Sequence, residues 1–405
     1  MTVDKLKNLR GSLCKPNEET FVVSLLNKVH EKGGFETVYT KNQWHSITNE
    51  LGLEQNSEEC FKFYRDHCMK FELYTLNKDK YDNDDSLKED VFTFGNFGCL
   101  QYPVCCYDLQ DWHERKEYYF GQSFVLLKNF EQLWNINKEI MSPSQIDKKY
   151  GDNEIDVVEQ RALAYGFNYN SKDLVQKKQT YTISRYIQYQ QQFMNSHLCR
   201  EQNQGKLVPE KIKFGVNIDI GDWKEVNKEL HAKVPAELFA NSNKDLCRFL
   251  RQHIPGMTIP QIYLKVPGCW TGGHQENLNM MAININHGPG DVEWYVVDVD
   301  EAKKFRKIVK HNYGVDVSHA EGLWYIDLEF CIKNDIKVTM FVQEEGDVVS
   351  LSPGTLHWVR SHEVTVNSAW NFGEHSYNQL SRICERWKVN SDIGFRSLIP
   401  TRTFF

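Results

Sequence analysis

The sequence has little that would commit it to a membrane or to an oxidising compartment. Its polar N-terminus, MTVDKLKNLRGSL, lacks the apolar core of a signal peptide, and no apolar run approaches the length needed to span a bilayer. It contains no C-x-x-C pair, and its 11 cysteines are scattered and odd in number, which disfavours a disulfide framework and a structural zinc site. We therefore expect a cytosolic or nuclear globular protein. The one cysteine cluster, Cys99, Cys105 and Cys106, is expected to pack in a core rather than to bind metal.

A net basic charge is also missing. The chain has 48 lysines and arginines against 55 aspartates and glutamates, which gives a net charge of -7. No overall positive field draws the whole molecule onto nucleic acid, so any such contact must come from a local patch. With 405 residues, 40% of them hydrophobic, the chain is long enough for two or three domains with a sizeable core.

Helical periodicity is present over residues 17–75. One helix runs through FVVSLLNKVH and ends at Gly33-Gly34, and a second is expected around Trp44 to Leu51. A third begins near Ser57 as its N-cap, and its apolar side consists of Cys60, Phe61, Tyr64, Met69 and Leu73. The acidic stretch that follows has almost no large apolar groups and is typical of an exposed linker. We predict a small all-α N-terminal domain over residues 1–76 and a linker over residues 77–118, acidic at its start.

From about residue 119 the pattern changes to short strands. SFVLLKNF is a buried-strand candidate, residues 179–200 and 224–239 read as helices, and IKFGVNIDI alternates over nine residues. That alternation places Ile212, Phe214, Val216, Ile218 and Ile220 on one face. Further strand candidates are IYLKV, MMAININ, EWYVVDV, VTMFVQ, DVVSLS and VTVNSAWNF, separated by Gly and Pro turns. The pattern predicts an α+β fold, a double-sheet roll of the jelly-roll type with flanking helices, over residues 119–405 with its core at about 212–380.

A His-x-Glu triplet, His274-Gln275-Glu276, leads into a stretch that alternates with a period of two, and His357 follows a Pro-Gly turn about eighty residues later. Two imidazoles and one carboxylate on one face of a metal are typical of mononuclear Fe(II) oxygenases, because the other coordination positions stay open. By composition alone roughly two such triplets are expected, and the chain has a second, His319-Ala320-Glu321. The two-residue steps from His274 reach Glu276, Met280, Ala282 and Asn284 on one face if the strand is unbroken, whereas His319 has no such continuation. We therefore assign the metal site to the first triplet and interpret His319 as a surface or helix-entry residue.

The strand before the triplet adds a possible anchor for an anion. Ile262, Leu264 and Val266 point one way, while Tyr263 and Lys265 point the other. If the polar face looks into the roll, Lys265 is a buried ammonium that requires an anionic partner, which a dicarboxylate co-substrate would supply. Thr271 and Asn284 are neutral donors suited to the same carboxylate. The alternative for Lys265 is an ordinary solvated strand face.

These residues resemble a known family. The run QIYLKVPGCWTGGHQENLNMMAININHGPGDVEWYVV, with GDVVSLSPGTLHWV and NSAWNFG, resembles the JmjC domain of UTX-type histone H3 lysine-27 demethylases, and the similarity extends over about residues 119–400. The resemblance implies a cupin-like double-stranded β-helix, a nuclear location, and Fe(II), 2-oxoglutarate and O2 as reactants. It assigns the site as follows: His274, Glu276 and His357 as iron ligands, Lys265, Thr271 and Asn284 as 2-oxoglutarate contacts, Tyr263 beside the substrate methylammonium, and Asn367 near the co-substrate.

Two departures from the family pattern stand out. The family has serine where this chain has Ala282, which removes one hydrogen bond to the co-substrate at a cost of about 0.5 to 1.5 kcal/mol. The cysteine-rich zinc domain that helps this group to grip the histone tail is absent from the sequence, so selectivity for lysine-27 is open.

The N-terminal segment resembles the later helices of an ARID DNA-binding domain, through LLNKVHEKGGFETVYTKNQWHSITNELGL and a helix that ends in FELY. DNA is the partner that this resemblance implies. Charge in the segment is close to balanced, with Lys62, Arg65 and Lys70 as the basic groups of the expected recognition helix, and phosphate contacts dominate nonspecific affinity. The alternative is a helical packing module without DNA contact.

The leading hypothesis is Fe(II)- and 2-oxoglutarate-dependent demethylation of N-methyl-lysine in a histone H3 tail, by a nuclear chromatin regulator. A protein hydroxylase on the same fold is the first alternative. A catalytically silent chromatin-binding scaffold is the second, although a silent domain has no physical need for two histidines and a glutamate that converge on one cavity.

Overall fold

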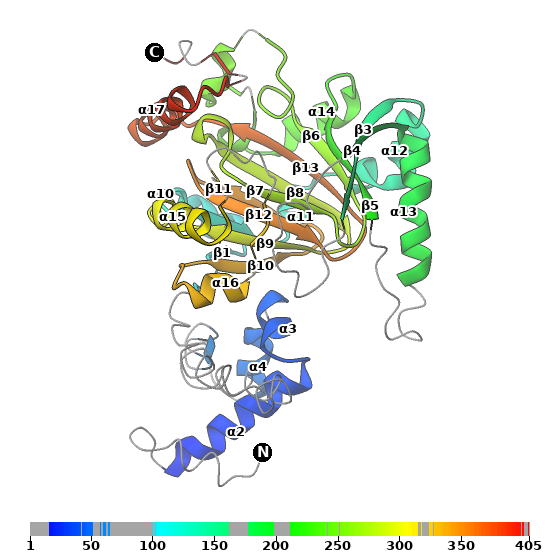
Figure 1. The fold of residues 1–405 in the computed structure, drawn as a ribbon. Helices are drawn as coiled ribbons and strands as arrows, with labels where there is room; N and C mark the ends of the chain where they lie inside the picture. The colour runs from blue at the N-terminus through cyan, green and yellow to red at the C-terminus, as the bar shows by residue number, and fades with distance from the viewer. Residues whose placement is uncertain are drawn as a thin grey trace. The chain divides into compact units, whose positions relative to one another are not determined.

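The computed structural model forms two compact units, residues 1–102 and residues 103–405. The structure describes residues 16–41, 43–51, 57, 60, 61, 64, 100, 101, 103–161, 177–197, 211–240, 242–250, 252–314, 317, 324–326, 328–397, 399, 400 and 404. Figure 1 shows the chain in ribbon form. Among these residues no helix is long and apolar enough to cross a membrane.

The first unit is helical, as predicted. Its described helices are α2 (Pro16–Glu31), α3 (Phe35–Thr40) and α4 (Trp44–Glu50). Gly33 and Gly34 adopt φ of 94° and 89° and donate to the carbonyls of His30 and Val29, which ends α2 where the sequence predicted. The short helix α3 was not predicted. Phe35 of α3 packs on Trp44, Phe61 and Tyr64, so an aromatic cluster holds this unit together.

The third predicted helix is described only in part. Ser57, Cys60 and Phe61 have helical backbone, and Cys60, Phe61 and Tyr64 are buried, as the predicted apolar side requires. Met69 and Leu73 lie outside the described residues.

The second unit is an α+β double-sheet fold, which confirms the predicted class. A nine-stranded sheet has the order β1-β2-β11-β8-β13-β6-β5-β3-β4, and a four-stranded sheet has the order β10-β9-β12-β7. Every pairing is antiparallel except that of β1 with β2. The strands are β1 (Cys105–Cys106), β2 (Phe124–Leu127), β3 (Glu154–Arg161), β4 (Lys177–Thr182), β5 (Lys211–Asp219), β6 (Gln261–Lys265), β7 (Trp270–His274), β8 (Met281–Pro289), β9 (Val292–Val297), β10 (Thr339–Gln343), β11 (Val348–Leu351), β12 (Leu356–Ser361) and β13 (Thr365–Phe372).

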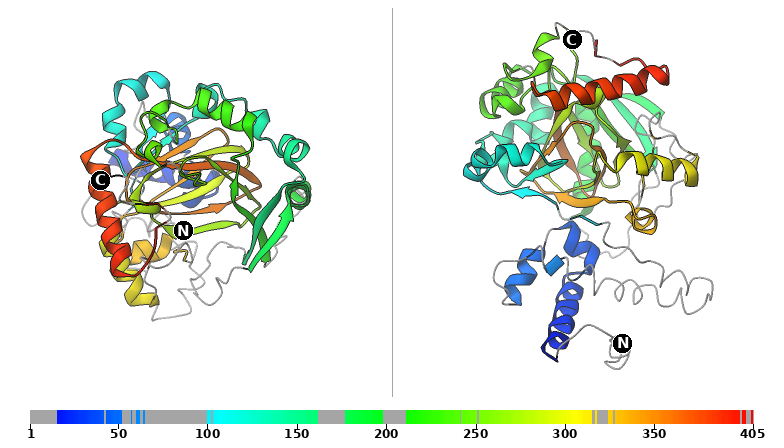
Figure 2. Two further views of the ribbon diagram at one scale, coloured as in Figure 1. Left: turned by 90° about the horizontal axis from the view of Figure 1, so that it is seen from above. Right: turned by 90° about the vertical axis from the view of Figure 1, so that its left-hand side faces the viewer.

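Helices cover the outer faces of this roll, as the two views in Figure 2 show. They are α9 (Leu109–Glu114), α10 (Lys116–Phe120), α11 (Phe130–Leu133), α12 (Pro143–Tyr150), α13 (Ile183–His197), α14 (Lys224–Lys233), α15 (Ala302–Tyr313), α16 (Leu328–Lys333) and α17 (Tyr377–Asp392). Short 3-10 turns are η3 (Lys138–Met141), η5 (Ala236–Leu238), η6 (Leu246–Phe249) and η7 (Asn277–Asn279).

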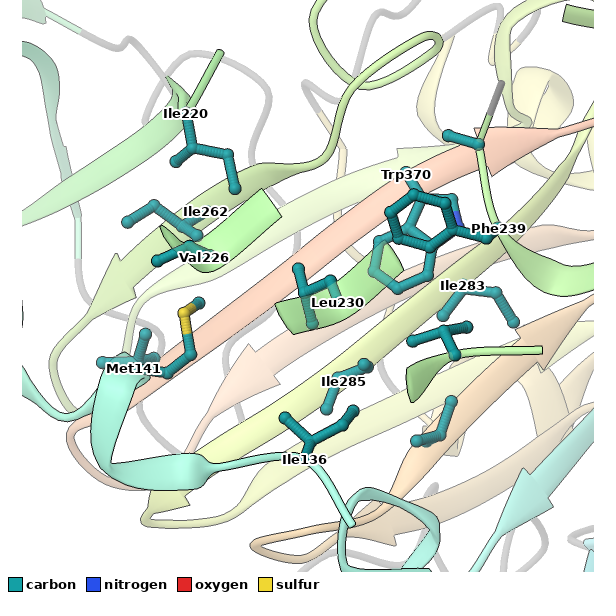
Figure 3. Close-up of a cluster of buried hydrophobic side chains, with 14 of the residues drawn as sticks. Ile136, Met141, Ile220, Val226, Leu230, Phe239, Ile262, Ile283, Ile285 and Trp370 are labelled. Atoms are coloured by element: carbon teal, nitrogen blue, oxygen red, sulfur yellow. The ribbon is translucent and has the colours of Figure 1, made fainter. Parts of the chain in front are cut away.

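Two cores follow from the alternation of the strands. Ile283 and Ile285 of β8 belong to a large core that includes Val226 and Leu230 of α14 (Figure 3). The residue before them, Ala282, lies in a second core, which the two sheets share and which includes Trp294 and Phe341 of the four-stranded sheet. Alternate residues of one strand thus separate the outer core from the space between the sheets, where a ligand cavity can form.

Three expectations about this unit were wrong in detail. The linker predicted to reach residue 118 ends earlier, because β1, α9 and α10 lie within the second unit and β1 pairs with β2. The helix predicted over residues 179–200 begins only at Ile183, because the preceding Thr-Tyr-Thr run pairs with β3 as strand β4. The third error concerns the alternation in β5.

Strand β5 does not keep its apolar residues on one face. Asn217 has φ of 52°, and the register with β6 shifts between Gly215 and Ile218. Such a bulge reverses the side-chain alternation. Ile212 and Phe214 consequently lie in a small core with Val266, whereas Ile218 lies in the large outer core.

One buried amide fastens the two sheets to each other. The Gln160 side chain of β3 donates to the carbonyl of Trp270 at 3.1 Å and accepts from the Trp270 backbone N–H at 2.8 Å. Gln160 is only 1% exposed, so no solvent replaces these bonds if the amide is lost. Because Trp270 begins β7, this contact fixes the edge strand of the smaller sheet.

We predict that Gln160→Leu lowers the free energy of unfolding by about 2 kcal/mol or more, because it leaves two buried backbone groups without partners. Chemical denaturation followed by tryptophan fluorescence measures the change. Gln179→Leu on the half-exposed strand β4 is the control and should stay within about 0.5 kcal/mol. Equal stabilities of the two variants would contradict the assigned role of Gln160.

Candidate metal centre and ligand cavity

The pairing of β7 with β12 places two histidines opposite each other. His274, the last residue of β7, is directly across from His357 in β12, and their ring centroids are 4.3 Å apart. His357 follows the turn at Gly354, where φ is 82°, as predicted from the Pro-Gly sequence. On its other side the His357 ring stacks on Trp294 at 5.6 Å, which holds the imidazole plane.

Backbone carbonyls orient both imidazoles. The Nδ1 of His274 lies 2.8 Å from the Gly272 carbonyl, and the Nδ1 of His357 lies 3.4 Å from the Thr355 carbonyl. A carbonyl only accepts, so each Nδ1 carries the proton and each Nε2 keeps its lone pair for a ligand bond. Both Nε2 atoms point to one place: they lie 3.7 Å (His274) and 3.5 Å (His357) from the same Glu276 oxygen.

Glu276 joins the site by a route that the sequence did not predict. The strand expected to continue from His274 to Asn284 is broken: β7 ends at His274, η7 follows, and Leu278 and Asn279 have φ of 51° and 52°. The chain then enters the other sheet as β8. Met280 is therefore not on the ligand face but packs in a separate core with Ile383 of α17. The structure thus brings His274, Glu276 and His357 together, but not along the unbroken strand that the sequence predicted.

The three donors suit a divalent metal. His274, Glu276 and His357 each offer a ligand atom, and these atoms lie within 4.8 Å of one another. Burial alone would raise the pKa of Glu276, but His274, His357 and Asn371 together outweigh burial and lower that pKa to about 2. Burial lowers the pKa of His357 to about 3. An ionised carboxylate and a neutral imidazole are the forms that bind metal, and two histidines with one carboxylate are the donor set of non-haem Fe(II) sites.

A cavity opens beside the three donors, between the two sheets. Its lining includes every predicted metal and co-substrate residue except Asn367: Tyr263, Lys265, Thr271, His274, Glu276, Ala282, Ile283, Asn284, Trp294, Leu351, His357, Val359 and Ala369. The strand-face prediction is confirmed within β6, because Tyr263 and Lys265 line the cavity while Ile262 and Leu264 lie in the outer core. It fails for Val266, which follows the end of β6 and packs in the small core with Ile212 and Phe214.

Lys265 places a cation at the inner wall. The residue is only 4% exposed, and burial lowers the pKa of its ammonium to about 8. Among the described residues, neither a hydrogen bond nor an ion pair is found for its Nζ. A buried ammonium without a counter-ion is costly, so the cavity favours an anion at this end.

Asn367 stands behind the cavity wall rather than in it. Its Nδ2 donates to Oδ1 of Asn284 at 3.0 Å, and its own Oδ1 accepts from the Thr365 hydroxyl at 3.1 Å. The Asn284 amide therefore has its oxygen engaged and its NH2 group available for an acceptor in the cavity. Asn367 acts on the cavity through Asn284.

The wall next to Asn284 is apolar where the resemblance implies a serine. Ala282 lines the cavity with a methyl group and packs in the inter-sheet core. On the opposite wall, the Tyr263 hydroxyl donates to Oδ1 of Asn217 at 3.0 Å, a bond that the β5 bulge makes possible. Burial raises the pKa of Tyr263, so its hydroxyl stays protonated at neutral pH.

Sequence reasoning missed the residue between the ligands. The Gln275 amide donates to the carbonyl of Gly354, in the turn before His357, and accepts from the Arg306 guanidinium of α15. Gln275 therefore joins the segment that carries His274 and Glu276 to the turn that carries His357. Asn371 was missed too, although it lies on the predicted strand β13: it hydrogen-bonds Glu276 and the Met281 carbonyl. Neither role leaves a signal in residue spacing, because both depend on tertiary contacts.

Two lesser predictions have different outcomes. Cys106 is buried in the large core, and burial raises the pKa of Cys105 to about 11, which keeps that thiol protonated. Cys99, like the competing triplet His319-Ala320-Glu321, lies outside the described residues.

Comparison with known families agrees with this geometry. Residues 261–372 match the family described as "JmjC domain, hydroxylase", and residues 16–72 match the "ARID/BRIGHT DNA binding domain". The chain therefore contains a JmjC domain and an ARID domain, which confirms both resemblances read from the sequence. All of the cavity residues lie within the JmjC match.

The individual relatives are lysine demethylases by name. Over 192 residues, 47% of this chain, it is 38% identical to human "Lysine-specific demethylase 6B". It is 28% identical over 194 residues to Caenorhabditis elegans "Lysine-specific demethylase jmjd-3.1", again 47% of this chain, and 27% identical over 181 residues, 41% of this chain, to Arabidopsis thaliana "Lysine-specific demethylase ELF6". The matches span 11%, 18% and 13% of those three proteins, so the chain shares only a small part of their length.

We predict that Gln275→Leu weakens Fe(II) binding by about 10- to 100-fold, the usual effect of removing a contact that orients metal ligands. Anaerobic titration with Fe(II), or with Co(II) followed by its absorption bands, measures the affinity. The control is His253→Ala, which removes a half-exposed histidine that binds Asp219. A Gln275→Leu protein with unchanged metal affinity would show that the bridge between the ligand segments has no influence on the site.

Proposed function

We propose that the second unit is an Fe(II)- and 2-oxoglutarate-dependent dioxygenase that demethylates N-methyl-lysine in a histone tail. The observation that carries the proposal is the convergence of two histidines, a glutamate and a buried lysine on one cavity. The JmjC match and the names of the relatives support the same reaction class.

The cavity supplies a place for each end of 2-oxoglutarate. The metal would be held by His274, Glu276 and His357, and the 2-oxo acid end of the co-substrate would bind beside it. Lys265 would receive the distal carboxylate, which gives the buried ammonium its missing counter-ion, with Thr271 and the free NH2 group of Asn284 as neutral donors. The Ala282 side chain offers no hydrogen bond on this wall, so the affinity for 2-oxoglutarate depends mainly on Lys265.

With iron, O2 and 2-oxoglutarate bound, the site supplies an oxidant that inserts one oxygen atom into a methyl C–H bond while 2-oxoglutarate becomes succinate and CO2. The hydroxylated N-methyl group then loses formaldehyde and leaves the free amine. Attack on C–H needs no nitrogen lone pair, so trimethyl-lysine is an allowed substrate. Tyr263 would lie beside the methylammonium and, with Asn217, orient it toward the metal.

We further propose histone H3 lysine-27 as the preferred site and the nucleus as the location. Support comes from the UTX-type resemblance and from the 38% identity with human lysine-specific demethylase 6B. The ARID match suggests DNA as a second partner, with weak affinity. In α2 and its C-terminal turn, Lys28 and Lys32 form ion pairs with Glu31 and Glu50, which reduces the positive charge available to phosphates.

A protein hydroxylase is the second candidate, because the matching family is described as a hydroxylase. The same cavity and reactants would serve it. The two candidates differ in product: a hydroxylase leaves one oxygen on its substrate, whereas a demethylase releases formaldehyde.

We predict that the full chain with Fe(II), ascorbate and 2-oxoglutarate removes 14 mass units per methyl group (~14 Da for CH2) from methylated histone peptides and releases equimolar formaldehyde. His274→Ala is the inactive control because it removes a metal ligand. Mass spectrometry of a peptide array, with succinate measured in parallel, tests activity and site choice together. A stable gain of one oxygen on unmethylated peptides would favour the hydroxylase, and the absence of any succinate would overturn both.

We predict that Lys265→Met weakens 2-oxoglutarate binding at least tenfold, yet raises the free energy of unfolding of the ligand-free protein at pH 7 by about 1 to 3 kcal/mol. Burial lowers the pKa of Lys265 from 10.5 to about 8, so the folded state binds this proton less well than the unfolded state. The destabilising effect is fully present below about pH 8 and disappears between pH 8 and 10.5. Urea denaturation at pH 7 and pH 9.5 should show the gain shrink, with exposed Lys178→Met unchanged as the control. Tight co-substrate binding by Lys265→Met would contradict the assigned role.

A further inference from the structure

Helix α15 has a charge pattern unlike the rest of this acidic chain. Its sequence, AKKFRKIVKHNY, contains four lysines, one arginine and one histidine in 12 residues and no acidic residue. The whole chain has a net charge of -7, so this helix is a local reversal of sign. A local patch of this kind is what a contact with a polyanion requires here.

The basic groups lie on the exposed side of the helix. Ala302, Phe305 and Val309 are buried, whereas Lys303, Lys307 and Lys310 are exposed at i, i+4 and i+7. These three positions form a row along one face and span about 10 Å of helix axis. The row is long enough to meet several phosphates of a nucleic acid strand, which follow one another about every 3.4 Å along the duplex axis.

An ordinary solvated helix face mixes both signs, and this chain provides an example. In α14, exposed Lys224 and Lys228 alternate with Glu225 and Glu229. In α15, Lys304 forms ion pairs with Glu301 and Asp335 near the N-terminal end of the helix. Within the part of the chain that the structure describes, no ion pair is found for Lys303 or Lys307. Like charges four residues apart destabilise a helix, so the pair favours an external anion.

Helix α15 is fastened to both segments that hold the metal ligands. Phe305 packs on Trp358, the residue after His357, with ring centroids 5.7 Å apart. Arg306 binds the amide of Gln275, between His274 and Glu276. A partner held on the exposed face of α15 is thus held in a fixed relation to the cavity, on the outer side of the four-stranded sheet (Figure 1).

We propose that the exposed face of α15, with Lys303, Lys307 and Lys310, is a docking surface for the sugar-phosphate backbone of duplex DNA, separate from the ARID domain. The contact is sequence-independent, since it uses ammonium groups on phosphates. Its consequence for a nucleosomal substrate rests on the proposed demethylase function: DNA on α15 would hold the nucleosome while a histone tail enters the cavity.

The test compares two matched double variants of the full chain. Lys303→Gln/Lys307→Gln removes two charges from α15, and Lys224→Gln/Lys228→Gln removes two charges at the same spacing from α14. Fluorescence anisotropy with a labelled 30-base-pair duplex, repeated at several salt concentrations, gives the affinity and its salt dependence. Each phosphate contact contributes about 0.9 to the slope of log K against log salt, and therefore close to tenfold in affinity at about 0.1 M salt.

For the α15 variant we expect a slope reduced by about 1.8 and affinity reduced by about 60-fold at about 0.1 M salt, with the α14 variant unchanged. Residual binding is assigned to the ARID domain. An unchanged slope in the α15 variant, or an equal loss in the α14 variant, overturns the proposal. Demethylation of a short free peptide, which carries no DNA, should be the same in all three proteins. If the unmodified protein shows no demethylase activity, the proposed function is wrong. The anisotropy result still decides whether α15 binds DNA.

Discussion

The site depends first on the register between β7 and β12. Antiparallel pairing brings His274 opposite His357, and a slip of one residue would turn His357 outward and Trp358 inward. The outer face opposes such a slip, because Trp358 packs on Phe305, Trp324 and Tyr295. Gly273 contributes as well: a Cβ there would lie 1.9 Å from the Trp324 ring, so only glycine allows this approach next to a ligand. Aromatic packing on the far side of the sheet therefore determines where the imidazoles point.

Packing around Trp358 both stabilises the fold and positions the histidines, whereas the buried Lys265 lowers the stability of the ligand-free fold. Lys265 is placed on the inner face of β6 by alternation, in a position where an apolar side chain would make the ligand-free fold more stable. Neighbouring contacts limit the freedom of its backbone: Gln190 of α13 donates to the Lys265 carbonyl, and Lys265 pairs with Thr365 of the adjacent strand β13. These contacts hold the backbone of Lys265 in place. The cavity is pre-organised at a cost in stability, which is the usual arrangement at a ligand site.

The sequence predicted the features of this site that depend on one continuous segment, and it missed those that depend on contacts between distant segments. Period-two alternation is a property of a single strand, so Tyr263 and Lys265 were assigned to the cavity face correctly. The Pro-Gly turn before His357 was equally local. Prediction failed where the backbone departs from regular strand geometry, at Asn217 in the β5 bulge and at Leu278 and Asn279 between β7 and β8. All three adopt positive φ; asparagine does so more often than most residues, but not often enough to locate a bulge from the sequence. It also failed for Gln275, Asn371 and Arg306, whose roles arise between segments far apart in the chain. The linker was predicted to be too long for the same reason: β1 forms only by pairing with β2, which is a tertiary contact.

The net charge of the chain describes the molecule as a whole, but it does not describe the charge of an individual surface such as that of α15. The chain has a net charge of -7, so a basic helix both attracts a polyanion and favours the orientations in which the polyanion faces that helix. Because α15 packs on the strand that carries His357 and binds Gln275 through Arg306, the favoured orientation is also defined relative to the metal centre. In the ARID unit, by contrast, the lysines of α2 and its C-terminal turn are paired with glutamates. The local charge of α15, rather than the net charge of the chain, is therefore the observation that supports DNA contact by the second unit.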